Sequence, residues 1–161
     1  MTKFASKFVL TVSLLVSVSV YADAELKVNQ LGAKIKKEII VYRSPTCGCC
    51  GKWIQHLKDN DFTVVDRVTV DVQTIKDKYG ISQSLASCHT ALVNGYVVEG
   101  HVPAEDINTM LSLRPNIKGI SVPGMVAGSP GMEMGERKDP YKVISFDDNG
   151  KLGLYRDYKE Y

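Results

Sequence analysis

The feature that most restricts the fold of this chain is a cluster of three cysteines, Cys47, Cys49 and Cys50, between an apolar run and a helical pattern. The fourth cysteine is Cys88. Two structural disulfides would be the simplest use of four cysteines in an exported protein. However, adjacent Cys49 and Cys50 can bond to each other only in a strained ring, and three clustered cysteines cannot all find local partners with good geometry. The spacing therefore favours a reactive or metal-binding thiol site.

Residues 1–24 have the pattern of a signal peptide. Two lysines precede the apolar run at residues 8–20, and residues 22–24 fit a cleavage site with small side chains. The run is short and rich in serine for a membrane span, and an uncleaved anchor is the alternative. We expect an exported, periplasmic protein with one domain at residues 25–161 and no membrane segment after cleavage.

The formal charge of the chain does not point to a charged polymer or a membrane as a partner. Cleavage would lower the formal net charge from +2 to +1, because residues 1–24 contain two lysines and one aspartate. That balance gives no argument for a nucleic acid or for an anionic membrane as a partner. We interpret the basic stretch at residues 34–38 as a solvated approach to a strand.

Apolar periodicity predicts alternating strands and helices. Asn94-Gly95, between two β-rich runs, is the strongest hairpin signal in the chain. This order predicts an α/β fold of the thioredoxin-like type, a βαβ unit followed by ββα. The predicted elements are a strand at 38–44, a helix at 49–60, a strand at 61–70, short helical pieces at 71–80 and 82–87, a hairpin at 88–101 and a helix at 103–113.

The tail differs from this core in composition. Residues 119–140 are rich in glycine and proline and have no periodicity, which predicts an irregular loop. Loops longer than about 15 residues in compact domains are usually functional or disordered. Residues 141–158 read as a last hairpin that turns at Asn149-Gly150. We therefore expect a C-terminal loop and β-hairpin extension on the thioredoxin-like core.

Cys47 and Cys50 have the spacing C-x-x-C and follow a strand at the start of a helix. A thiol at a helix N-terminus has a lowered pKa, because free N–H groups and the helix dipole favour the thiolate. Thiolates attack disulfides and also bind metals. A third thiol at Cys49 would compete in disulfide exchange, whereas a soft metal would gain a ligand. Both chemistries remain open at this point.

The predicted hairpin supplies further donors. Counting outward from a two-residue turn at Asn94-Gly95 places Cys88 opposite His101, about 5 Å apart between Cβ atoms. In thioredoxin-like folds this segment faces the C-x-x-C and carries a cis-proline, but no proline is present here. His89 neighbours Cys88 and points the other way in a strand, so hydrogen bonding near the groove is as good an interpretation as metal binding.

Three methionines, Met125, Met132 and Met134, lie in the glycine- and proline-rich loop, where no periodicity predicts their burial. Thioether sulfur suits Cu(I), so they are candidate ligands or gates, with loop packing as the alternative. Other candidates are better explained structurally. We expect His56 at the surface, and Met110 and Trp53 in the core.

Charge argues for more than one metal ion. Four thiolates would carry a charge of −4, which one Zn²⁺ or Cu⁺ cannot offset in a partly buried site. Bridging between several cations offsets it. A single zinc site with three cysteines and one histidine is the main rival. That rival is hindered because Cys49 and Cys50 are adjacent and cannot easily share one tetrahedral ion with Cys47.

The stretches "SPTCGCCGKW", "SCHTALVNGYVVEGHVPAEDI" and "GISVPGMVAGSPGMEMG" together resemble the CopG-type copper-resistance proteins of Gram-negative periplasms. The resemblance covers about residues 37–161. It implies a thioredoxin-like fold, a sulfur-rich multinuclear copper site and an oxidoreductase role between copper oxidation states. The family commonly has Met-Pro before "GSPGME", whereas this chain has Met-Val-Ala at 125–127. By motif, the resemblance implies as ligands Cys47, Cys49, Cys50, Cys88 and His101.

Three functions follow from these observations. The first is a periplasmic protein that binds Cu(I) and Cu(II) and protects against excess copper through conversion between the two oxidation states. Its expected partners are copper ions and other periplasmic copper-handling proteins. The second is a thiol-disulfide oxidoreductase with Cys47 and Cys50 as catalytic residues. The third is a zinc-stabilised binding module.

Overall fold

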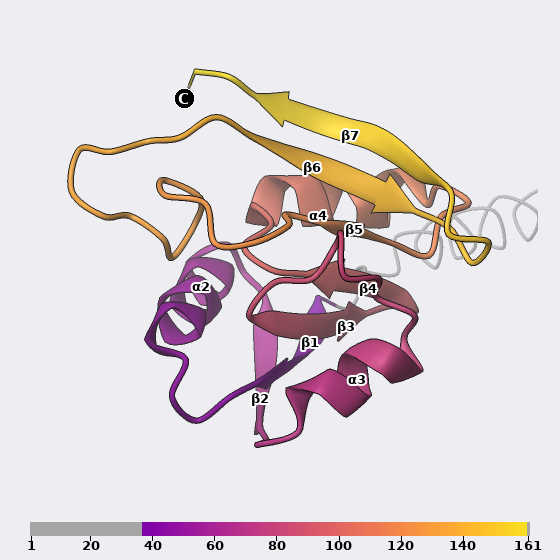
Figure 1. The fold of residues 1–161 in the computed structure, drawn as a ribbon, viewed down its shortest axis with the longest axis horizontal. Helices are drawn as coiled ribbons and strands as arrows, with labels where there is room; N and C mark the ends of the chain where they lie inside the picture. The colour runs from indigo at the N-terminus through magenta and orange to yellow at the C-terminus, as the bar shows by residue number, and fades with distance from the viewer. Residues whose placement is uncertain (1–36, 161) are drawn as a thin grey trace, which may run out of the picture. The chain divides into compact units, whose positions relative to one another are not determined.

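The computed structural model describes residues 37–160, so the predicted signal peptide at residues 1–24 lies outside the described residues. The fold is mixed α/β (Figure 1). No helix in this part of the chain has the length and apolar character needed to cross a bilayer. The elements are β1 (Glu38–Arg43), α2 (Gly48–Asp59), β2 (Thr63–Val68), α3 (Val72–Lys78), β3 (His89–Val93), β4 (Tyr96–Glu99), α4 (Ala104–Leu113), β5 (Gly119–Ser121), β6 (Tyr141–Phe146) and β7 (Leu152–Tyr158).

The seven strands form one sheet in the order β2-β1-β3-β4-β5-β6-β7. β1 pairs with β2 in parallel and with β3 antiparallel, and β3 pairs with β4 antiparallel. β5 joins β4 in parallel and β6 antiparallel, and β7 closes the sheet as an antiparallel edge strand. Apart from the helical piece at 82–87, the predicted order of strands and helices through residue 113 is therefore present, and the last hairpin extends the same sheet.

The central hairpin has the register expected from its turn. Asn94 and Gly95 both have positive φ, 46° and 87°, as a tight hairpin turn requires. Val93 lies opposite Tyr96, and the ladder runs outward to Thr90 and Glu99.

Two predictions about irregular segments are wrong. Residues 119–121, expected in a loop, form β5, because they pair with β4 on one side and with β6 on the other. Three residues are too few to show the alternating pattern that predicts a strand. The expected helical piece at 82–87 is only a turn, in which the Leu85 N–H donates to the Ser82 carbonyl at 2.9 Å. Leu85 packs in an apolar cluster with Ile81, Val97 and Phe146, so tertiary packing holds this turn.

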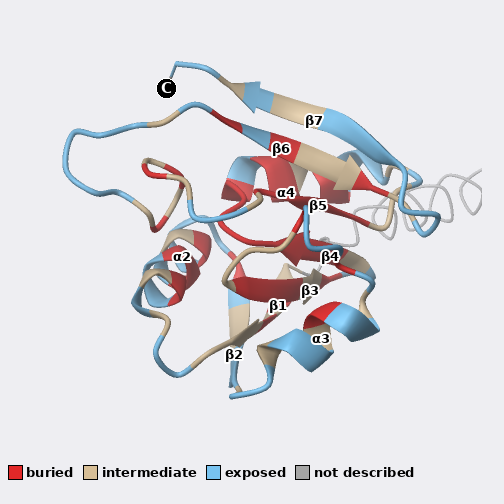
Figure 2. Cartoon of the chain, viewed as in Figure 1, coloured by how far each residue is buried: buried red, intermediate tan, exposed pale blue. Residues whose placement is uncertain are grey.

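Helices α2 and α3 cover opposite faces of the sheet. Adjacent residues of a strand point to opposite faces. His89 of β3 stacks on Trp53 of α2, whereas Thr90 accepts a hydrogen bond from Lys76 of α3 at 3.1 Å. Trp53 and Met110 are fully buried, which confirms both as core residues (Figure 2 shows the buried strands and helix faces in red).

A buried ion pair crosses the α3 face. Lys76 Nζ lies 2.5 Å from Glu99 Oε1, and both side chains are almost completely buried. Thr90 donates to Glu99 Oε2 at 2.6 Å, and the Ser87 N–H donates to Glu99 Oε1 at 2.6 Å. This network ties α3 and the central hairpin to the residue that precedes Cys88.

The loop before β6 packs against the start of α2. Gly131 has φ +82°, and a Cβ built on it would lie 2.7 Å from the Trp53 nitrogen and 3.0 Å from the Cys49 carbonyl oxygen. Real Cβ atoms do not approach backbone that closely, so only glycine allows this contact. The glycine- and proline-rich loop therefore lies directly against the cysteine-bearing helix.

The C-terminal hairpin is attached to α4 through a buried carboxylate. Tyr158 donates to Asp106 Oδ2 at 2.8 Å, and Arg156 forms an ion pair with the other oxygen. Burial raises the pKa of Asp106, and these two partners act against that effect. The hairpin turns over residues 147–151, where the Asp147 side chain accepts from the Asn149 and Lys151 N–H groups, both at 2.9 Å.

We predict that Glu99→Ala lowers the free energy of unfolding by about 3–5 kcal/mol, because it leaves the Lys76 ammonium buried without its partner. Urea unfolding of the metal-free protein measures the loss. Asp66→Ala is the control, since its pair with Arg43 is partly solvated and should contribute less than about 1 kcal/mol. Equal losses in the two variants would contradict the prediction.

We predict that Gly131→Ala destabilises the protein more than Gly135→Ala. Both glycines have positive φ, so both substitutions introduce a backbone strain of about 1–2 kcal/mol. Only Gly131 would also place a methyl group against the backbone of α2, since nothing lies within 4 Å of the Cβ position of Gly135. Denaturant unfolding of the two variants measures the additional loss of stability in Gly131→Ala. Equal losses in the two variants would show that the close contact between the loop and α2 does not contribute to stability.

Candidate metal centre

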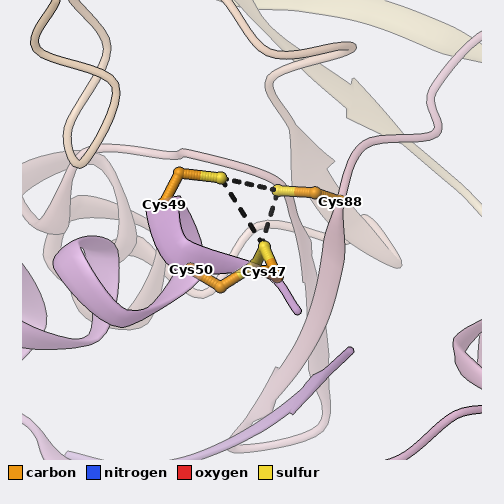
Figure 3. Close-up of side chains that lie close together, drawn as sticks. All are labelled: Cys47, Cys49, Cys50 and Cys88. Atoms are coloured by element: carbon orange, nitrogen blue, oxygen red, sulfur yellow. Dashed lines mark hydrogen bonds between the residues drawn. A yellow bond between two sulfur atoms is a disulfide. The ribbon is translucent and has the colours of Figure 1, made fainter. Parts of the chain in front are cut away.

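The four cysteines come from two segments that the fold brings together (Figure 3). Cys47 is the N-cap of α2, and Cys49 and Cys50 lie in the first turn of this helix. Cys88 immediately precedes β3, which lies beside β1 in the sheet. Because α2 follows β1, the sheet places the helix N-terminus and Cys88 at the same end of neighbouring strands. The predicted association of Cys88 with the triplet is present.

One disulfide is formed, between Cys47 and Cys50. Cys49 and Cys88 are free thiols, each half-buried. The Cys49 sulfur lies 3.6 Å from that of Cys47 and 3.9 Å from that of Cys88. The Cys88 sulfur also lies 3.6 Å from that of Cys50. Four sulfur atoms thus lie within 4.8 Å of one another, an arrangement that could hold a soft metal once the disulfide is reduced.

His101 extends the sulfur cluster with a nitrogen donor. Its Nε2 lies 3.1 Å from the Cys88 sulfur, so the two residues are neighbours as predicted, although the ladder between β3 and β4 ends at Thr90 and Glu99. Its Nδ1 lies 2.8 Å from the Pro130 carbonyl oxygen, an acceptor, so Nδ1 carries the proton and Nε2 presents a lone pair to the site. Burial lowers the pKa of His101. The loop thereby orients a neutral imidazole, the form that binds metals.

Gly100 turns His101 toward this face. It has φ +74°, and a Cβ there would lie 2.5 Å from the Val122 carbonyl oxygen and 2.6 Å from the Ser87 Cβ. If side chains continued to alternate between the two faces of the sheet after Glu99, His101 would point to the face that α3 covers. The bend instead brings the rings of His101 and His89 edge to face, with centroids 4.9 Å apart.

His89 lies deeper than the sulfur atoms. Its Nδ1 is 3.3 Å from the Cys88 sulfur, and its ring stacks on Trp53 with centroids 4.2 Å apart. Its Nε2 is buried and has no hydrogen-bond partner among residues 37–160. Burial, and secondly His101, hold the pKa of His89 well below its usual value. Cys88, His89 and His101 form a second group of possible ligands, which shares Cys88 with the first.

A metal ion at Cys88 would have to displace a proton. Burial raises the pKa of its thiol to about 12, and the nearby Cys49 sulfur acts in the same direction. At neutral pH the metal-free site therefore holds this thiol protonated, and a metal ion must displace the proton when it binds.

The remaining candidates differ in exposure. Met125 and Met134 expose 60% and 65% of their surface, and Met132 is half-buried in a turn where its N–H donates to the Ser129 carbonyl at 2.8 Å. His56 is half-buried, although we expected it at the surface, and its Nε2 accepts the Ala104 N–H at 3.0 Å. That bond uses the lone pair that a metal would need. Burial lowers the pKa of His56.

Sequence reasoning missed several residues that shape the site. The Pro130 carbonyl and Gly131 act through backbone positions, for which the glycine-rich loop was the only signal. Glu99 was visible as an acidic residue in one of the two β-rich runs, but its partner Lys76 could not be identified without the packing of α3.

Comparisons with known proteins agree with this site. The model of the family described as "Protein of unknown function, DUF411" matches residues 85–132, which include Cys88, His89, His101 and the loop. Two solved structures of copper resistance protein CopG, forms 1 and 2, are each 44% identical to this chain. They cover 76% and 75% of it and 98% and 97% of their own chains, with TM-scores of 0.73 and 0.72. No curated protein matches.

The matched region spans nearly the whole of both solved chains, and its likeness extends to sequence as well as to fold. At this identity and coverage, the chain belongs to the CopG copper-resistance protein family.

Proposed function

We propose that this chain is a periplasmic copper-binding protein of copper resistance, which holds several copper ions at the cysteine and histidine cluster and interconverts Cu(I) and Cu(II). The observation that carries the proposal is the sharing of Cys88 between two groups of donors, one of four sulfurs and one with two imidazoles. A thiolate that belongs to two groups can bridge two ions. Its relatives are described as copper resistance proteins, which supports copper as the metal.

The donor chemistry supports copper over zinc. Thiolate and imidazole ligands suit Cu(I), and four thiolates need more than one monovalent cation to offset their charge. Cys49 and Cys50 are consecutive in α2, so they would serve different ions more easily than one tetrahedral ion. The ligands of this proposal are Cys47, Cys49, Cys50, Cys88, His89 and His101, with Met125, Met132 or Met134 completing the site from the loop.

The fold supports the same interpretation. The strand order β2-β1-β3-β4, with β1 and β2 parallel and α2 and α3 on opposite faces, is the arrangement that a βαβ–ββα core requires. We therefore interpret residues 38–113 as a thioredoxin-like core and β5 to β7 as its extension. In this interpretation the extension contributes the Pro130 carbonyl and the methionines to a site that the core alone would leave open.

A second function is favoured by one observation, the disulfide between Cys47 and Cys50 at the N-terminus of α2. A thiol-disulfide oxidoreductase uses a C-x-x-C pair in this position. Two features weigh against it. Cys88 occupies the place of the cis-proline, and the free Cys49 sulfur, 3.6 Å from Cys47, would intercept a mixed disulfide with a protein substrate.

We predict that the fully reduced protein binds Cu(I) more tightly than Zn²⁺, because soft sulfur donors dominate the site. We also predict that Cys88→Ser lowers the number of copper ions bound while the fold is retained. The bridging position of Cys88 between the two donor groups is the reason. Competition with a chromophoric Cu(I) chelator measures binding, and circular dichroism monitors the fold. Zinc that stays bound when Cu(I) is present in excess would favour the alternative of a zinc-stabilised binding module. Unchanged copper binding in the variant would exclude Cys88 as a bridge.

We predict that replacing Met125, Met132 and Met134 together with leucine weakens Cu(I) binding or impairs Cu(I)/Cu(II) cycling, because leucine keeps the apolar bulk and removes the sulfur donors. Met110→Leu is the matched control, since this methionine is fully buried in α4. Reduction of a disulfide substrate should stay unchanged in both variants. A triple variant that binds and cycles copper like the control would assign the three methionines to loop packing.

A further inference from the structure

With Cys47 and Cys50 joined, the two remaining thiols are directed toward each other. The Cys49 and Cys88 sulfurs are 3.9 Å apart, and Figure 3 shows their side chains pointing together from opposite sides. A disulfide requires a separation of about 2.05 Å, so the two sulfurs must approach by less than about 2 Å to bond. A bond between them would leave none of the chain's four cysteines free.

Cys88 is the fixed member of this pair. The preceding Ser87 N–H donates to the buried Glu99 carboxylate at 2.6 Å, and the Ser87 hydroxyl donates to the Gly124 carbonyl. Cys49 is half-buried in the first turn of α2, next to the exposed Gly48. A turn of the Cys49 side chain on the first turn of α2 can therefore close the gap.

We propose that Cys49 and Cys88 form a second redox-active disulfide, so that the reduced site holds four electrons and converts four Cu(II) ions to Cu(I). This inference rests on the proposed copper function for its oxidant. It adds an electron source for the copper conversion, namely the protein's own thiols in two pairs.

The reaction balances without a further co-reactant. Each pair loses two electrons and two protons as its S–S bond forms, and each electron reduces one Cu(II) to Cu(I). Oxidation of Cys47 with Cys50 and of Cys49 with Cys88 thus yields two disulfides, four Cu(I) ions and four protons released to solvent. The step occurs once per reduced chain, and Cu(II) is the only oxidant.

Oxidation also removes the ligands that hold the product. Thiolates bind Cu(I) strongly, whereas a sulfur in a disulfide has lost the charge that attracts the ion. After both pairs close, the two imidazoles are the donors left from the two ligand groups. The oxidation that reduces copper therefore also weakens the binding of the Cu(I) product. Weaker binding favours transfer of Cu(I) to an acceptor.

The first test uses no copper. The reduced protein is oxidised with diamide under native conditions, alkylated and digested with trypsin. Cys47, Cys49 and Cys50 fall in the peptide 44–52, and Cys88 falls in the peptide 79–118. We expect no alkylated cysteine and a covalent link between these two peptides. Two alkylated thiols in the oxidised parent protein would overturn the proposal.

One double variant and one single variant assign the bond. Cys47→Ser with Cys50→Ser leaves only the proposed pair and should give the linked peptides. Cys49→Ser alone should leave Cys88 alkylated while Cys47 and Cys50 still pair. If Cys88 becomes linked in the Cys49→Ser variant as readily as in the parent, Cys49 is not its partner and the proposal fails.

The second test counts electrons. Cu(II) is added anaerobically to the reduced protein, and a chromophoric chelator reports the Cu(I) formed. We expect four Cu(I) per chain for the parent, and two for each double variant, Cys47→Ser with Cys50→Ser or Cys49→Ser with Cys88→Ser. A yield of two from the parent would overturn the four-electron site.

The two tests separate this inference from the proposed function. A protein that forms both disulfides with diamide but binds no Cu(I) when reduced would refute the copper function and retain the second pair. A protein that binds Cu(I) tightly but never links Cys49 to Cys88 would refute only the inference.

Discussion

The buried carboxylate of Glu99 is the contact on which the site depends. It accepts hydrogen bonds from Lys76, Thr90 and the Ser87 N–H, and so joins α3 to both strands of the central hairpin. A buried charge is tolerated only when it is paired and fully hydrogen-bonded. The position of Ser87, and with it that of Cys88, is therefore set by a requirement of the core. The candidate ligand Cys88, at the end of this segment, is therefore held in place by the protein itself.

The other side of the site is set by close backbone packing. Gly131 allows the loop to touch α2, and the neighbouring Pro130 carbonyl holds His101 in the tautomer with a free Nε2. The Trp53 indole donates to the Val102 carbonyl at 2.8 Å, and His56 accepts from Ala104, so α2 also holds the segment just after His101. Hydrogen bonds and close backbone packing thus bring together sulfur and nitrogen atoms from distant parts of the sequence.

Much of this arrangement follows from short-range signals in the sequence. The Asn94-Gly95 turn sets a register, and counting along it predicts the observed proximity of Cys88 and His101. The ladder itself ends at Thr90 and Glu99, and the bend at Gly100 turns His101 toward the site. The C-x-C-C motif at a helix start correctly places three thiols together. The features that the sequence did not predict depend on tertiary contacts. β5 is too short to show the alternating pattern of a strand. The hydrogen bond from the Ala104 N–H to His56 forms only once α2 and α4 are packed together. The ligand roles of the cysteines, histidines and methionines stay predictions, and two of the methionines are largely exposed.

The stacking of Trp53 on His89 has a spectroscopic consequence. Trp53 is the only tryptophan of the chain, and its ring lies 4.2 Å from an imidazole that itself touches the Cys88 sulfur. Indole emission is sensitive to nearby charge and is quenched by contact with electron acceptors. The intrinsic fluorescence of the unlabelled protein is therefore a local signal from the interior of the site, and it can be followed without any dye or engineered probe.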